Sequence, residues 1–222
     1  MRKIILASLF LTAFCVMGCS TPNTTTAIST SNKQESAEDK DQVRTAQKNV
    51  ADILKECKQS YDKIDDSRCF FSLLPDLAPT RDGQINCCIT WVATTDGEKC
   101  NLDLYIREES TRWIFWDGFT FYSDIGRYKY KMNEKHDARF DGKTEKVYNM
   151  YVSEGYVHSF KDFKDQIKIL TDGQAPVIRL SGIKGIHDHY LSTEEIESLK
   201  TGLILYNELE KCNFIINQDD LK

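Results

Sequence analysis

The sequence lacks an excess of positive charge. Its 29 Lys and Arg residues are outnumbered by 34 Asp and Glu residues, and the formal net charge at pH 7 is −5. Proteins that bind nucleic acids neutralise phosphate groups with clustered Lys and Arg side chains. The charge balance therefore argues against a nucleic-acid partner.

The motifs that mark common catalytic and cofactor sites are also missing. The sequence has no GxSxG, no HExxH, no Walker-type loop and no dinucleotide fingerprint. No two cysteines have the CxxC spacing of redox-active pairs. We expect no cofactor, and no motif favours an enzyme, although a Ser-His-Asp triad that assembles only in space would leave no such signature.

Length and composition favour one folded domain. Apolar residues make up 41% and aromatic residues 11% of the 222 residues, which is ordinary for a globular protein. A chain of this length is long enough for one sizeable core once a leader and a tether are subtracted. We divide it into residues 1–18, 19–40 and 41–222, with the single domain in the last range.

The first residues have the layout of an export signal. Arg2 and Lys3 precede an apolar run over residues 4–17, which is too short for a transmembrane helix of a mature protein. We expect this segment to be a signal peptide that is cleaved. Its removal leaves 27 basic against 34 acidic residues, a net charge of −7.

The signal ends in Val16-Met17-Gly18-Cys19, which resembles the lipobox of bacterial lipoproteins. The resemblance implies cleavage after Gly18 and a diacylglycerol thioether on Cys19, the new N-terminus. Several acyl chains, such as palmitate, hold a protein on a membrane almost permanently. Ser20, in place of the Asp that favours inner-membrane retention, implies the outer membrane of a bacterial envelope, facing the periplasm. The alternative is a plain secretory signal in which Cys19 is incidental.

The segment that follows reads as a tether. Residues 20–40 are rich in Ser, Thr, Asn and charged residues, and Ile28 is their only large apolar residue. Such a segment cannot bury enough surface to offset its ordering entropy. As a random coil it would reach roughly 25 Å, which keeps the domain near its membrane without forcing contact.

Helical periodicity marks both ends of the domain. Apolar residues at three- and four-residue steps predict a helix over residues 40–64. Ser192 and Glu195 form a capping box, which predicts the start of a second helix that runs to about Cys212. The domain should therefore be framed by an N-terminal and a C-terminal helix.

Between these helices the period changes to two, which predicts strands. The alternation around Asp96-Gly97 predicts a hairpin with that dipeptide as its turn, so that Ala93 pairs with Cys100. Residues 113–122 fit either a second hairpin or one strand with a glycine bulge. Strands are also expected at 145–152, 155–160 and 176–181, a short helix at 160–170, and a solvated loop at 129–143. The predicted class is α+β, with an antiparallel sheet of about five to seven strands.

Six cysteines remain for the domain once Cys15 is cleaved away and Cys19 is lipidated. An even number in an exported domain indicates disulfides, and zinc is the less favoured alternative because no histidine stands at finger spacing from a cysteine. Cys87 and Cys88 point to opposite faces of one strand, so they should have different partners. The disulfide candidates are Cys57, Cys69, Cys87, Cys88, Cys100 and Cys212.

His187-Asp188-His189 is the one tight group of potential metal ligands. On a strand the two histidines would share a face and could hold a metal, with Asp188 or Glu154 as a candidate base. Nearby glycines and the helix start that follows favour a turn, which would point the rings apart. We assign no metal site and keep His187 and His189 as weak candidates.

An aromatic cluster is the densest feature of the domain. Because the segment alternates, one face should pack into the core, while the other is covered by a helix or forms an exposed binding patch. The possible patch consists of Trp113, Phe115, Trp116, Phe119, Phe121 and Tyr122.

These features support three hypotheses on function. The first is a non-enzymatic envelope lipoprotein, attached to the membrane by its lipid, that binds a protein or glycan partner. The second is a metal-assisted hydrolase centred on His187 and His189. The third is a structural or accessory subunit of an envelope or secretion assembly.

Overall fold

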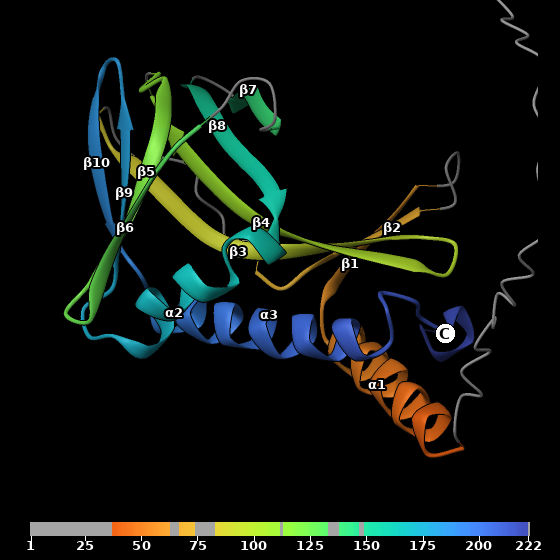
Figure 1. The fold of residues 1–222 in the computed structure, drawn as a ribbon. Helices are drawn as coiled ribbons and strands as arrows, with labels where there is room; N and C mark the ends of the chain where they lie inside the picture. The colour runs from red at the N-terminus through yellow and green to blue at the C-terminus, as the bar shows by residue number, and fades with distance from the viewer. Residues whose placement is uncertain are drawn as a thin grey trace, which may run out of the picture. The chain divides into compact units, whose positions relative to one another are not determined.

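The computed structural model describes residues 37–62, 67–73, 83–111, 113–132, 138–146 and 149–221. The predicted signal peptide, the lipidation site and most of the predicted tether lie outside these ranges. Helices α1 (Ala37–Lys55) and α3 (Thr193–Lys211) lie near the two ends of the described chain, and α2 (Lys164–Asp172) comes between them in sequence. With the strands they form an α+β fold, which confirms the predicted class (Figure 1). No helix in the described part of the chain is both long and apolar enough to cross a membrane.

The larger of two antiparallel sheets has six strands. This number lies within the predicted range. In spatial order the strands are β1 (Lys58–Asp62), β2 (Ser67–Phe71), β3 (Ile85–Asp96), β4 (Lys99–Ser110), β8 (Asn149–Ser159) and β7 (Ala138–Lys146).

A second, four-stranded sheet was not predicted from the sequence. In spatial order its strands are β10 (Gly185–Tyr190), β9 (Val177–Gly182), β5 (Trp116–Ser123) and β6 (Gly126–Lys131). The interpretation of residues 129–143 as a solvated loop is wrong, because β6 and β7 extend into this range. Charged residues mark only the solvent side of β6, and its other side carries tyrosines that pack against the core.

The predicted first helix is too long. α1 ends at Lys55, and residues 58–62 form β1 instead of a further helical turn. The backbone of β1 pairs with β2 from Lys58 to Asp62, so the edge of the larger sheet supplies hydrogen bonds that a helix would otherwise have made. Few apolar residues lie in this stretch, so periodicity alone could not decide between the two structures.

The predicted hairpin exists, but its register differs by two residues. Asp96 pairs with Lys99, which makes Gly97 and Glu98 the turn, and Ala93 pairs with Leu102 instead of Cys100. The backbone φ of Gly97 is 54°, a left-handed conformation that glycine adopts at low cost. The shift leaves the same set of residues on the buried face, because side chains alternate between the two faces with a period of two residues.

α3 lies directly against β3 (Figure 1). Both hydrogen bonds of the predicted capping box form at its start, between Ser192 and Glu195. A Cβ atom at Gly202 would lie 2.6 Å from Cδ1 of Trp91, so glycine permits this close approach. The indole N–H of Trp91 donates to the carbonyl of Ser198 over 2.8 Å.

An aromatic cluster connects the two sheets with α2. The ring of Phe163, which immediately precedes α2, lies 5.6 Å from Phe119 of β5, 5.2 Å from Tyr130 of β6 and 6.3 Å from Tyr156 of β8, measured between ring centroids. Short 3-10 helices precede α2 at Phe160–Asp162 and end the described chain at Gln218–Leu221. One face of the four-stranded sheet is therefore fixed in the core.

Candidate functional site

The four-stranded sheet has one buried and one exposed face. Phe119, Phe121, Ile178 and Leu180 are at most 1% exposed on the buried face. The opposite face, which we call the outer face, presents side chains from every strand of the sheet. Its exposed residues are Tyr122, Arg127, Lys129, Lys131, Arg179, Ile186, Asp188 and Tyr190.

Strand pairing places these side chains in rows across the sheet. In one row, Tyr190 of β10 is opposite Val177 of β9, which is opposite Tyr122 of β5, which is opposite Arg127 of β6. Side chains on one face of neighbouring strands approach each other directly. Residues from four strands, which belong to two separate hairpins of the chain, therefore meet in this row.

The adjacent row carries the charged groups. Asp188 of β10 is opposite Arg179 of β9, followed by Thr120 of β5 and Lys129 of β6. The guanidinium of Arg179 donates to both carboxylate oxygens of Asp188, each over 2.6 Å. This hydrogen bonding from Arg179 lowers the pKa of the Asp188 carboxyl.

A shallow cavity of about 330 Å³ lies on the outer face, and we call it the tyrosine pocket. Tyr122 is 52% and Tyr190 is 70% exposed, although large aromatic side chains are usually buried. The pocket is lined by Thr120, Tyr122, Arg127, Ala175, Val177, Arg179, Asp188 and Tyr190.

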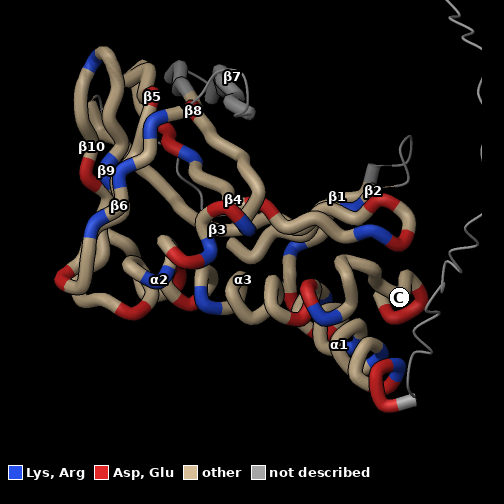
Figure 2. The backbone as a smooth tube through the Cα atoms, viewed as in Figure 1, with Lys and Arg blue, Asp and Glu red and all other residues tan. Residues whose placement is uncertain are grey.

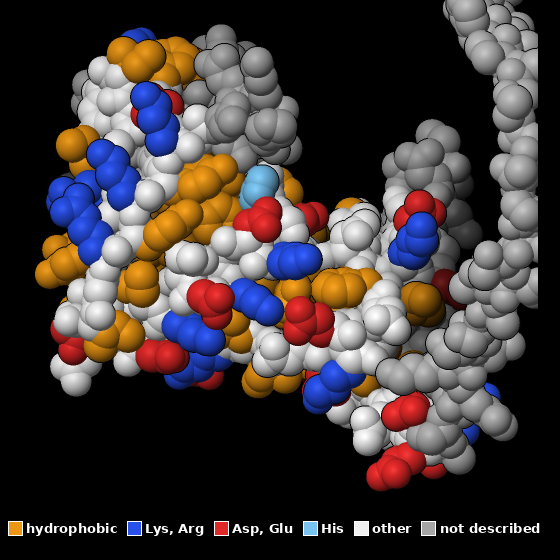
Figure 3. All heavy atoms as spheres, viewed as in Figure 1, with side chains coloured by type: hydrophobic (Ala, Val, Ile, Leu, Met, Phe, Trp, Pro, Cys, Tyr) orange, Lys and Arg blue, Asp and Glu red, His pale blue; other side chains and the backbone are white. Residues whose placement is uncertain are grey.

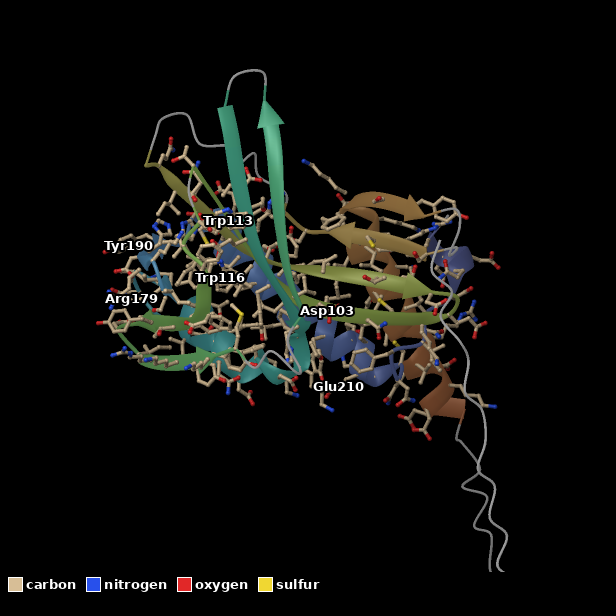
Figure 4. The ribbon with its side chains drawn as sticks, turned by 90° about the horizontal axis from the view of Figure 1, so that it is seen from above. Asp103, Trp113, Trp116, Arg179, Tyr190 and Glu210 are labelled. Carbon is tan, nitrogen blue, oxygen red and sulfur yellow. The ribbon has the colours of Figure 1, made fainter. Side chains whose placement is uncertain are left out.

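The outer face is more basic than the protein as a whole. It carries four Lys or Arg residues and one Asp, whereas the formal charge of the chain is −5. Figure 2 marks basic positions along the strands of the four-stranded sheet, and Figure 3 shows basic side chains gathered on the surface there. Arg127 forms no ion pair with another residue of the described ranges. In Figure 4 the side chains of Arg179 and Tyr190 lie together on the outer side of the sheet.

The six aromatic residues of the predicted patch do not form one surface. Trp116, Phe119 and Phe121 are buried in the core, and Tyr122 alone belongs to the outer face. The two remaining residues, both half-buried, stack on each other with ring centroids 5.6 Å apart. They are Trp113 and Phe115.

The sequence left open whether residues 113–122 form a hairpin or one strand with a glycine bulge, and the structure contains the bulge. β5 is one strand with a register shift between Trp116 and Gly118. A Cβ atom at Gly118 would lie 2.6 Å from the carbonyl oxygen of Tyr130, so only glycine fits this approach of β6.

The expectation of a turn at His187 and His189 is wrong. Both lie in β10, which forms a tight hairpin with β9, and they share the face of the strand that points away from the outer face. The glycines taken as turn signals flank the two-residue turn at 183–184 and allow the hairpin. Asp188 points the other way and pairs with Arg179.

His189 is part of a buried hydrogen-bond cluster. Its Nε2 lies 2.8 Å from the carboxylate of Glu195, which is 4% exposed and also accepts the backbone N–H of Ile89 over 3.0 Å and that of Ser192 over 2.8 Å. Burial lowers the pKa of the neighbouring His187, and His189 adds to the shift. Within the described ranges, no three His, Cys, Asp or Glu side chains are grouped so that they could hold a metal ion.

The carboxylate of Glu154, the other candidate base, accepts hydrogen bonds from the backbone. It accepts the N–H groups of Ile114 over 2.6 Å, Phe115 over 2.7 Å and Trp116 over 3.0 Å. Glu108 lies opposite Glu154 in the pairing of β4 with β8 and is fully buried. Burial raises the pKa of Glu108 to about 8, and the adjacent Glu154 adds to the shift.

The six cysteines of the domain are free thiols in the structure, so disulfide formation stays a prediction. The fold brings Cys100 of β4 next to Cys212 at the end of α3, because the backbone N–H of Cys100 donates to the carbonyl of Phe214 over 3.0 Å. Burial raises the pKa of the Cys100 thiol, and nearby Cys212 raises it further.

Comparison with known proteins assigns no relative. No known protein family matches the chain, and no curated protein or solved structure is detectably similar to it. Function is therefore inferred from the residues themselves.

Arg127, Arg179 and Tyr190 were not predicted from the sequence as site residues. The available signal was the alternation of Arg127, Lys129 and Lys131 with two tyrosines, which is typical of a strand with one solvent-facing side. No local pattern could show that this strand lies in the same sheet as Tyr190, because their pairing joins distant parts of the chain.

Proposed function

We propose that the protein is a lipid-anchored envelope lipoprotein that binds another envelope component without catalysing a reaction. The outer face of the four-stranded sheet is its binding surface. Lipid on Cys19 anchors the protein in the outer membrane, and the folded domain faces the periplasm.

The composition of the outer face is the observation that carries this proposal. Tyrosine and arginine are enriched among the residues that dominate binding energy at interfaces, and they surround the tyrosine pocket on an exposed sheet face. A largely buried opposite face holds this surface rigid, since its rings pack against Phe163 and α2. A rigid surface loses little conformational entropy on binding.

The anchor is supported by the lipobox-like sequence before Cys19 and by the polar segment that follows it. A tether of that composition concentrates the domain near one membrane, which increases the effective concentration of partners in the same envelope. Cys19→Ser should abolish lipid attachment. A variant that still partitions into detergent like the wild type would contradict the anchor.

The hydrolase hypothesis requires His187 and His189 to act together on one metal or substrate. His189 instead contacts the buried carboxylate of Glu195, which is also bonded to two backbone N–H groups. An accessory subunit of an assembly would use the same outer face as a binding protein does. Crosslinking from the outer face therefore tests the binding protein and the accessory subunit alike.

Site-directed photo-crosslinking in intact envelopes tests the binding surface. A photo-reactive phenylalanine analogue is introduced at Tyr190, on the outer face, or at Ile204, which is 57% exposed on α3. We expect a discrete, reproducible crosslinked product from position 190 and none from position 204. Equal crosslinking from the two positions, or none from position 190, would contradict the proposal.

A further inference from the structure

The two exposed tyrosines of the outer face stand at a defined separation. Tyr190 on β10 and Tyr122 on β5 occupy the same row, with β9 between them. Two strand spacings place their backbones about 9.5 Å apart. Val177 lies between them and is 9% exposed, so it forms a low apolar floor.

A backbone separation of about 9.5 Å leaves room for one saturated or planar ring between the two side chains. A ring in van der Waals contact with an aromatic group on each side needs about 7 Å between the two flanking planes, given contacts of about 3.5 Å. The cavity volume of about 330 Å³ is at the small end for ligand pockets and holds one or two sugar units. The C–H faces of a sugar ring pack well on tyrosine, and the tyrosine hydroxyl groups remain free to hydrogen-bond.

The charges around the pocket select an anion. Arg179 and Arg127 both line it, and Lys129 follows in the adjacent row. Arginine binds carboxylate and phosphate groups through paired N–H donors. Asp188 holds Arg179 in place and retains lone pairs on each oxygen that could accept hydrogen bonds from sugar hydroxyl groups.

We propose that the tyrosine pocket binds a saccharide that carries a carboxylate or phosphate group, as part of an anionic envelope glycan. This inference depends on the proposed function and names the ligand class of the same surface. The ring lies on Val177 between Tyr122 and Tyr190, and its charged group pairs with Arg127 or Arg179.

A lipid surface fits the outer face less well. Docking on a flat membrane would leave the tyrosine pocket empty. The exposed side chains of Ile125 and Ile183 lie in turns at opposite ends of the sheet, so they do not add a continuous apolar contact to the outer face.

Calorimetric titration of the full protein in an uncharged detergent tests the ligand class. The probes are tetragalacturonate, which carries carboxylates, maltotetraose as a neutral oligosaccharide of equal length, and glycerol 3-phosphate as a lipid-headgroup fragment. We expect tetragalacturonate to bind at least about tenfold more tightly than either of the other two probes, a difference of about 1.4 kcal/mol.

Matched variants locate the site. Arg127→Gln and Tyr190→Ala should each weaken tetragalacturonate binding by at least about fivefold. Lys99→Gln removes one positive charge and Tyr61→Ala one tyrosine ring from exposed positions on the six-stranded sheet, and each should change tetragalacturonate binding by less than about twofold. Equal losses in all four variants would overturn the assignment to this pocket.

The remaining outcomes separate this inference from the proposed function. Equal binding of the neutral and anionic oligosaccharides would overturn the requirement for charge, and tighter binding of glycerol 3-phosphate would assign the surface to lipid headgroups. If tetragalacturonate does not bind while crosslinking from position 190 persists, the saccharide inference is wrong and the proposed function stands. If both fail, both are wrong.

Discussion

The carboxylate of Glu154 on β8 accepts the backbone N–H of Phe115 over 2.7 Å, in the segment that leads from the six-stranded sheet into β5. The φ of Phe115 is 51°, so the chain turns here through a left-handed residue, and N–H groups of three consecutive residues point at one acid. Backbone N–H groups arranged in this way form an anion-binding nest, which here holds an internal carboxylate.

Loss of this carboxylate should destabilise the fold strongly. Glu154→Ala leaves three backbone N–H groups without their acceptor, and buried unpaired donors cost about 1–3 kcal/mol each. We expect the free energy of unfolding to fall by about 3–5 kcal/mol in urea titrations, whereas Glu98→Ala, at an exposed turn position, should change it by less than about 0.5 kcal/mol. A small effect at Glu154 would refute its structural role.

Glu108 should make stability depend on pH. Its pKa is raised from 4.5 to about 8 by burial, so the folded state binds a proton that the unfolded state releases between these values. The contribution of Glu108 to stability should therefore be fully present below pH 4.5 and be lost as the pH rises toward 8.

The corresponding variant is Glu108→Gln, which keeps the shape of the neutral acid and cannot ionise. It should be more stable than the wild type at pH 8 by about 2–4 kcal/mol and equal to it near pH 4. Urea unfolding at several pH values measures this. Parallel pH profiles for the two proteins would show that Glu108 does not titrate in this way.

The fold was predictable from sequence where it depends on local interactions. The capping box at Ser192 and Glu195 and the two-residue period of β3 need only neighbouring residues to be recognised. The tyrosine pocket could not be predicted, because β5 pairs with β9, more than fifty residues later in the chain. The end of α1 was missed for the same reason, since β1 exists through its pairing with β2.

The two histidines of β10 should differ in their effect on stability. His189→Ala removes a partner of the buried Glu195 carboxylate and should cost about 1–3 kcal/mol. His187→Ala, whose buried Nε2 has no hydrogen-bond partner among the described residues, should cost less. Equal effects in thermal or urea unfolding would contradict the role of the Glu195 cluster.

Disulfide mapping tests whether the cysteines of the domain are oxidised after export. We predict at least two bridges in the protein isolated from the envelope, one of them between Cys100 and Cys212, because these residues are neighbours in the core. Cys87 and Cys88 should not bond to each other, since they lie on opposite faces of β3. Mass spectrometry of non-reduced peptides decides this. Six free thiols would argue against both the bridges and an oxidising compartment.

Three exposed tyrosines provide the most direct test of the binding surface. Tyr122 and Tyr190 lie on the outer face at 52% and 70% exposure, and Tyr61 on β1 of the other sheet has 51%. Radical labelling followed by mass spectrometry compares each side chain in the purified protein and in intact envelopes. If the outer face binds an envelope component, labelling of Tyr122 and Tyr190 should fall severalfold in the envelope while that of Tyr61 stays unchanged. Equal labelling of all three tyrosines in both settings would contradict the account.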